Sequence, residues 1–126
     1  LETARIVAAE RGVPVTPLAD LREKRFGTWE GLTDAEVLAR FPDAHATGWG
    51  DGETTDEMAA RVVAALLRIS GEHPGESVLV VTHGGPIRAV LRLCRAEDGP
   101  IRNCATIGVA FPRLCIVSRP NLVSLG

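Results

Sequence analysis

The sequence lacks several features that would assign a protein to a broad class at once. It has three cysteines in 126 residues, and their spacing includes no C-x-x-C, which argues against a disulfide framework or a zinc site. No apolar run approaches the roughly 20 residues that cross a bilayer, and no signal-peptide pattern opens the chain. The formal net charge of −2 offers no attraction to nucleic acid or to an anionic membrane, so neither is expected as a partner.

The composition is that of a globular domain. Hydrophobic residues make up 45% and charged residues 24% of a chain long enough for one compact core, so a single domain is expected over residues 1–126. Cys94, Cys104 and Cys115 look like reduced, packed thiols of a cytoplasmic protein. No His, Asp or Glu set has the spacing of metal ligands, and neither a metal nor another cofactor is expected. A homodimer is left open.

Helical patterns alternate with short apolar runs, which predicts an α/β layered sheet. Four helices are expected: from residue 1 to a stop at Gly12, from the capping box at Thr33 through about Phe41, from a second capping box at Thr54 to near Gly71, and from Pro86 through about Arg95. A buried strand is expected at 78–82, and two closing strands around Pro112. The helix that opens the chain has no N-cap and no Met before it, from which we expect further sequence upstream.

The stretch VLVVTHGGPIR places a histidine at the end of the expected buried strand. In open α/β sheets the ligand crevice lies beyond the carboxyl ends of the strands, where His83 stands. Gly84 and Gly85 allow a sharp turn, and the helix start that follows presents free N–H groups suited to an anion such as phosphate. The alternative interpretation is a plain strand-to-helix turn with a capping histidine, and the spacing alone does not separate the two.

The stretch LREKRFGTWEG places carboxylates beside cations in a glycine-punctuated loop. Glu23 and Glu30 are its candidate acid/base groups, because a carboxylate near a phosphate can move the proton of a leaving group. A solvated charged turn is the alternative. A strand-end histidine and a loop glutamate in one crevice would form an acid/base constellation, which the spacing of the sequence does not itself establish.

In this order and spacing, ETARIVA, LREKRFGTWEG, GDGET…R and VTHGGPIR resemble the later part of the histidine phosphatase superfamily, the phosphoglycerate-mutase-like proteins, from Leu1 to about Cys94. The resemblance implies a three-layer α/β/α fold with a mostly parallel sheet. It also implies that Glu23 protonates the leaving oxygen and then activates water, with Glu30 the weaker candidate. His83 would stabilise the phosphoryl group in flight, and Gly84 would lend it a backbone N–H. The implied substrate is a small phosphorylated metabolite.

The family's nucleophile, a histidine in an Arg-His-Gly motif on the first strand, has no match here. The remaining histidines, His45 and His73, lie in other contexts and are expected at the surface. We therefore expect the first strand and the nucleophile upstream of Leu1, so that the sheet of this chain lacks its first strand and the apolar strand 78–82 has an unpaired edge. The chain alone is accordingly expected to be inactive and poorly stable.

The branch of the family is indicated by a short connection. Only residues 42–52 separate Phe41 from Glu53, where related mutases carry a longer insertion, so a phosphatase is preferred over a mutase. Asp51 stands where relatives usually have proline, a departure expected to affect only the pocket rim. Two other classes stay open: a pseudoenzyme that acts as a phosphate-binding or scaffold module, and the C-terminal phosphatase domain of a larger fused protein. Three aromatic residues could form an apolar wall or could simply be packed: Phe26, Trp29 and Trp49.

Overall fold

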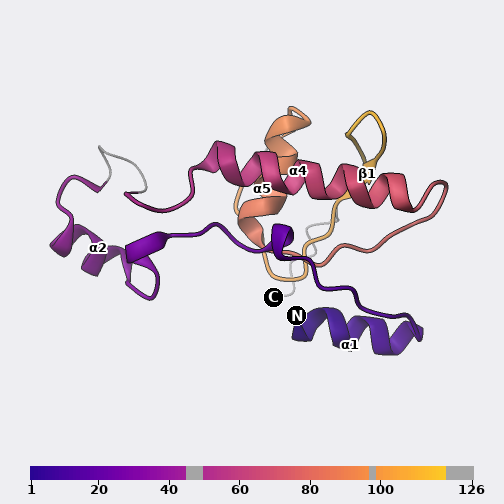
Figure 1. Ribbon diagram of the computed structural model, residues 1–126, viewed down its shortest axis with the longest axis horizontal. Helices are drawn as coiled ribbons and strands as arrows, with labels where there is room; N and C mark the ends of the chain where they lie inside the picture. The colour runs from indigo at the N-terminus through magenta and orange to yellow at the C-terminus, as the bar shows by residue number, and fades with distance from the viewer. Residues whose placement is uncertain (45–49, 97–98, 119–126) are drawn as a thin grey trace.

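Helices account for most of the regular structure in the computed structural model, which describes residues 1–44, 50–96 and 99–118. The longest helix, α4, runs across the molecule, and α5 crosses it (Figure 1). Helix α2 lies at one end of the molecule, and α1 lies apart from α2 and α4 (Figure 1). The elements in chain order are α1 (Glu2–Arg11), 3₁₀ turns at Ala19–Leu21 and Gly27–Trp29, α2 (Asp34–Arg40), α4 (Thr55–Glu72), α5 (Gly84–Leu93), β1 (Gly108–Ala110) and β2 (Cys115–Ser118).

The predicted helix ends are set by local hydrogen bonds. At the start of α4 the Thr54 hydroxyl accepts the Glu57 N–H at 3.1 Å, and the Glu57 carboxylate accepts the Thr54 N–H at 2.8 Å. The same reciprocal capping box, from Thr33, opens α2. Gly12 ends α1 with φ +63°, a left-handed conformation that glycine adopts without steric cost. These three predictions are confirmed.

Helix α5 begins earlier than the sequence pattern predicts. His83 is its N-cap, with extended backbone angles of φ −117° and ψ 169°, and Gly84 and Gly85 are the first two helical residues. Pro86 is therefore the third helical residue rather than the first. It is tolerated there because the N–H groups of the first helical turn have no partner within the helix.

The core lies where α4 crosses α5. Met58 and Val62 of α4 meet Ala89 and Val90 of α5, and all four are at most 4% exposed. Truncating a buried methionine such as Met58 to alanine typically costs about 2–5 kcal/mol, so this crossing anchors the surrounding elements. The residues packed against it come from several segments: Leu21, Ala59, Leu66, Cys94, Ile107, Val109 and Leu114.

The two closing strands are confirmed as an antiparallel hairpin. Val109 of β1 faces Ile116 of β2 and Ala110 faces Cys115, with a bulge between Gly108 and Val109. This hairpin is the sheet of the described part of the chain. The hairpin packs Val109 and Leu114 against the α4–α5 core.

The predicted strand over 78–82 is not formed. This segment is a plain tube in Figure 1, and within the described ranges no segment pairs with it. A strand requires a hydrogen-bonded neighbour as well as an apolar sequence, and Val78, Leu79 and Val81 are instead 46%, 66% and 39% exposed. Their predicted burial on both faces is therefore wrong for this structure.

The predicted packing of the cysteines fails in part. Cys104 and Cys115 are exposed rather than packed, while Cys94 is partly buried against the hairpin. Helix α1 forms as predicted; Ala8 is its buried residue, and Leu1 and Val7 are 61% and 37% exposed.

Candidate active site

The loop that carries Glu23 is held from α4 by one arginine. The Arg61 guanidinium donates to the backbone carbonyl oxygens of Asp20 at 2.6 Å, Arg22 at 3.0 Å and Glu23 at 3.1 Å. A planar fork of five N–H donors can reach several carbonyls at once, which a single ammonium cannot do in the same geometry. The backbone on both sides of Glu23 is therefore fixed to a helix that is itself part of the core.

The Arg61 fork is paired with a buried carboxylate. Arg61 Nε and Nη2 donate to the two carboxylate oxygens of Glu53 at 2.6 and 2.8 Å, and the Glu53 side chain is 1% exposed. Glu53 also accepts the Arg25 N–H at 3.2 Å, and its own N–H donates to the Arg25 carbonyl at 2.8 Å. The hydrogen bonds from Arg61 hold the pKa of Glu53 below its ordinary value of 4.5 and outweigh its burial.

Lys24 adds a further attachment of this loop to α4. The residue is 8% exposed, and its Nζ donates to the Thr55 hydroxyl at 3.0 Å. Burial lowers the pKa of Lys24, with the nearby Glu53 carboxylate acting in the opposite direction. The Lys24 side chain therefore contacts α4, whereas the carboxylate of the preceding residue, Glu23, contacts α5.

The Glu23 carboxylate reaches the first turn of α5. Its Oε2 accepts the Gly85 N–H at 3.2 Å, and its Oε1 accepts the N–H of Lys24 at 2.9 Å. A Cβ built on Gly85 would overlap this carboxylate, so only glycine allows the approach. The carboxylate thus occupies one of the donors that a helix N-terminus offers to an anion.

His83 is brought to the same place by the segment that precedes α5. It is the N-cap residue, its side chain makes no capping hydrogen bond, and it is exposed. The hydroxyl of Thr82 donates to the Leu21 carbonyl at 2.6 Å, which ties the end of segment 78–82 to the loop of Glu23. The structure therefore gathers Glu23, His83 and the Gly84–Gly85 turn at one end of α5.

Other candidates lie elsewhere. Glu30 accepts the Phe26 N–H within its own turn at 3.3 Å, and the indole of Trp29 packs against the ring of Phe41 with centroids 6.0 Å apart. His73 is exposed, as predicted, and pairs with Glu76 at 3.1 Å. His45 and Trp49 lie outside the described residues.

Asp51, which was expected only at a pocket rim, binds a neighbouring turn. Its Oδ1 accepts both the N–H and the hydroxyl of Thr28, each at 3.0 Å, and these bonds lower its pKa. Gly27 and Gly52 pack so closely in this contact that a Cβ on either would meet backbone atoms within 3 Å. Asp51 therefore fastens the Gly27–Trp29 turn to the segment that leads into α4.

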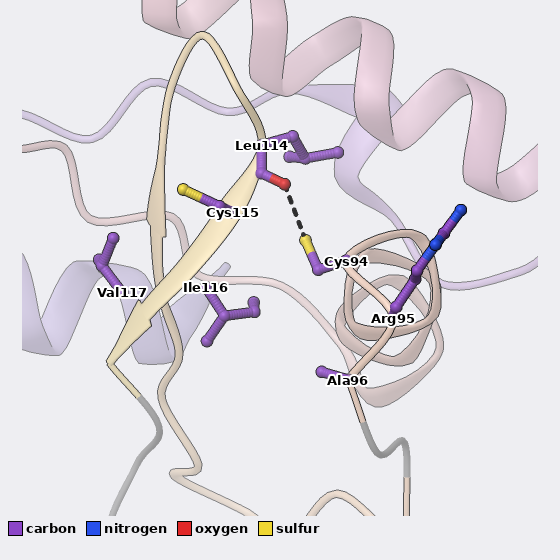
Figure 2. A pocket seen from close by; sticks show the side chains of 7 residues that line it. All are labelled: Cys94, Arg95, Ala96, Leu114, Cys115, Ile116 and Val117. Carbon is purple, nitrogen blue, oxygen red and sulfur yellow. Dashed lines mark hydrogen bonds between the residues drawn. The ribbon is translucent and has the colours of Figure 1, made fainter.

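A pocket lies at the other end of α5, away from the candidate residues. It is lined by Cys94, Arg95 and Ala96 on one side and by residues 114–117 of the hairpin on the other (Figure 2). The thiol of Cys94 donates to the Leu114 carbonyl at 3.2 Å across it. Its lining includes neither Glu23 nor His83. Within the described ranges, no group of three or more His, Cys, Asp or Glu side chains gathers as a metal site would require, and no helix is long and apolar enough to span a membrane.

The residues that hold this site were only partly visible in the sequence. Arg61 and Glu53 fall within the GDGET…R stretch, but no local pattern predicts that Arg61 donates to the carbonyls of residues 20, 22 and 23 while pairing with Glu53. Thr82, immediately before the histidine, carried no predicted role. The signal that could have drawn attention to Glu53 and Arg61 is their spacing of eight positions across a capping box, which places a carboxylate just before a helix and a cation two turns inside it.

Together, the fold and these contacts define an α/β protein with a carboxylate and a histidine at a helix N-terminus. The family model of the histidine phosphatase superfamily (branch 1) matches residues 1–119, and the chain belongs to this superfamily. It is 38% identical over 123 residues to the phosphoglycerate mutase-like protein 4 of Arabidopsis thaliana, covering 90% of this chain and 54% of that protein. It is 36% identical to the metal-independent phosphoserine phosphatase of the same plant, covering 89% of this chain and 52% of that protein.

Two more similarities bear on the fold and on length. The structure superposes on YhfR of Bacillus stearothermophilus with a TM-score of 0.80 and 25% identity, covering 95% of this chain and 67% of that one, which confirms the α/β fold class. A bifunctional protein of Mycobacterium tuberculosis is 38% identical over 99 residues, which are 27% of its length. The chain spans about half the length of the two plant relatives.

Proposed function

We propose that this chain contributes the acid/base and phosphoryl-binding half of a phosphomonoesterase active site. The observation that carries the proposal is the position of the Glu23 carboxylate, which reaches the Gly85 N–H at 3.2 Å, two residues after His83. A proton-transfer group and an exposed imidazole stand at one helix N-terminus, where the free N–H groups and the helix dipole favour a phosphate. Support also comes from relatives named as phosphatases.

In the proposed reaction a nucleophilic histidine attacks phosphorus, and the bond to the leaving oxygen breaks. Glu23, in its acid form, gives its proton to that oxygen. The Glu23 carboxylate then takes a proton from water, whose oxygen attacks phosphorus, and the phosphorus–nitrogen bond breaks to release phosphate. His83 and the Gly84 N–H stabilise the charge on the phosphoryl oxygens in both steps.

The nucleophile is the part of this proposal that the printed sequence does not supply, because it contains no Arg-His-Gly. We propose that polypeptide ahead of Leu1 carries it. Hydrolysis is preferred over mutase chemistry because the connection from Phe41 to Glu53 is short. The substrate class is a small phosphomonoester, and the proposed chemistry uses no metal or other cofactor.

The test is hydrolysis of phosphate esters by the longest natural polypeptide that contains this chain. His83→Ala should lower the turnover of an aryl phosphate by about a hundredfold, as expected for a lost stabiliser of transition-state charge. The control is His73→Ala, which removes an exposed histidine outside the site. Glu23→Gln should cost about 10²–10⁴-fold on alkyl phosphates, whose leaving groups need a proton, while Glu30→Gln costs little.

Two results would overturn the proposal. Turnover unaffected by His83→Ala would remove His83 from the site. A natural polypeptide that binds phosphate or vanadate without turnover would favour the pseudoenzyme, a phosphate-binding or scaffold module. The name of the mycobacterial relative favours testing for a fused protein as well, and the coding sequence upstream of Leu1 would show a second domain directly.

A further inference from the structure

Arg61 uses every N–H of its guanidinium on the backbone and carboxylate around Glu23. Nε and Nη2 bind Glu53, Nη1 binds the carbonyls of Asp20 and Arg22, and Nη2 also binds the carbonyl of Glu23. These are five hydrogen bonds from the five donors that an arginine possesses. None of the five goes to a group that would touch a substrate.

We propose that Arg61 is the positioning residue of Glu23: paired with Glu53, it fixes the backbone of residues 20–23 so that the Glu23 carboxylate reaches the first turn of α5. This inference rests on the proposed role of Glu23 as general acid and base. It adds a residue that acts on proton transfer through another residue and not on the phosphoryl group.

Arg61 can fix the position of Glu23 because it joins the loop of Glu23 to a helix that is anchored in the core. Arg61 precedes Val62, which is 1% exposed in the α4–α5 core, so the guanidinium projects from an anchored helix. On the loop, Arg61 holds the carbonyls of Arg22 and Glu23. The Cα of Glu23 is therefore fixed, and only the side-chain rotamer then determines where its carboxylate lies.

Glu53 orients Arg61 and holds the other side of the loop. Its carboxylate receives two of the five Arg61 hydrogen bonds and one from the Arg25 N–H, and its own N–H is bonded to the Arg25 carbonyl. The backbone is thus fixed two residues after Glu23 as well as before it. A displacement of about 1 Å in a reacting group can cost about a hundredfold in rate, so this clamp matters to catalysis even though it is remote from phosphorus.

A leaving-group comparison tests the inference in the longest natural polypeptide. Arg61→Lys keeps the charge but cannot make five hydrogen bonds in a plane. We expect turnover of an alkyl phosphate to fall by at least about tenfold more than turnover of a nitrophenyl phosphate, whose leaving group departs without a proton. Arg68→Lys is the matched control. Arg68 lies on the same helix and pairs with Asp20, but both side chains are 49% exposed, and among the described residues Arg68 holds no backbone carbonyl of the Glu23 loop.

The turnover rate of the alkyl phosphate divided by that of the nitrophenyl phosphate distinguishes an effect on positioning from an effect on folding. A variant that only reduces the folded fraction lowers both rates equally and leaves the ratio unchanged, and that result would overturn the inference. Should Arg61→Lys fail to fold, Glu53→Gln keeps the shape of the partner and must lower the same ratio, to a smaller extent. Glu23→Gln is the reference variant. If it lowers this ratio but the Arg61 and Glu53 variants do not, the positioning role of Arg61 is refuted and the proposed function stands. If Glu23→Gln leaves the ratio unchanged, the proposed function itself is refuted.

Discussion

The carboxylate of Glu23 and the backbone N–H of Gly85 are joined by a hydrogen bond of 3.2 Å that spans 62 positions of the sequence. It connects the loop held by Arg61 with the helix capped by His83. Because the donor is a backbone group in the first turn of α5, the carboxylate occupies a place that the helix dipole makes favourable for an anion. A phosphoryl oxygen and the Glu23 carboxylate are therefore suited to the same donors.

Gly85→Ala tests this relationship directly. The added Cβ would overlap the carboxylate, so Glu23 must move, although alanine in a helix is ordinarily favourable by about 1 kcal/mol. We expect turnover of an alkyl phosphate to fall by about 10–100-fold, with little loss of thermal stability. Gly71→Ala is the control, since a Cβ there meets nothing within 4 Å. Full activity in Gly85→Ala would show that Glu23 need not lie where the structure places it.

Thr82→Val tests the second tie between the two halves of the site. The change keeps the shape of the side chain but removes the hydroxyl that donates to the Leu21 carbonyl at 2.6 Å. We expect the free energy of unfolding to fall by about 1–2 kcal/mol, because the carbonyl loses its partner. Thr82→Ser keeps the hydroxyl and should retain most of that stability in the same denaturant titration. A larger loss in Thr82→Ser than in Thr82→Val would assign the effect to packing of the methyl group, which valine retains, and not to the hydrogen bond.

The Glu53–Arg61 pair should give the protein an acid-sensitive component of stability. The pKa of Glu53 is lowered in the folded protein from its ordinary 4.5, so the unfolded chain takes up a proton first as the pH falls. The stabilisation by ionised Glu53 is complete above the pKa that Glu53 has in the unfolded chain. It is lost as the pH falls through the lower pKa that Glu53 has in the folded protein. We expect Glu53→Gln to be less stable by about 3 kcal/mol at neutral pH, and the difference from the parent to narrow below about pH 4.5.

Denaturant titrations from neutral pH into the acid range would measure that difference. Glu76→Gln is the comparison, because the Glu76 side chain is 66% exposed and its pair with His73 should contribute little throughout. If the difference in free energy of unfolding between the parent and Glu53→Gln stays constant into the acid range, Glu53 does not lose its charge there. That result would contradict the pH dependence expected from its hydrogen bonds.

The helix ends could be predicted because their signals are local. Each capping box joins residues three apart, and Gly12 needs only its own backbone freedom, so the sequence carries the whole interaction. The strand over 78–82 could not be predicted in the same way. An apolar run states that a segment suits burial, whereas a strand also needs a neighbour, and pairing is not written in the segment itself.

The candidate site shows the same division. Glu23 and His83 were named from their motifs, and the structure brings both to the N-terminus of α5. The residues that place them were missed because their contacts are distant: Arg61 reaches carbonyls 38 to 41 positions away. Asp51 was expected to shape only a rim, but its carboxylate fastens Thr28, 23 positions away, which no spacing rule anticipates.

The three thiols should separate into fast and slow classes. Burial raises the pKa of Cys94, and its S–H donates to the Leu114 carbonyl, so the reactive thiolate is disfavoured twice. Cys104 and Cys115 are exposed. A coloured aromatic disulfide reagent should therefore titrate two thiols quickly and the third at least about tenfold more slowly in the native protein, and all three together in denaturant. Cys94→Ser should remove the slow class alone. A fast reaction at Cys94 would mean that the pocket between α5 and the hairpin opens readily, which its hydrogen bond across that pocket argues against.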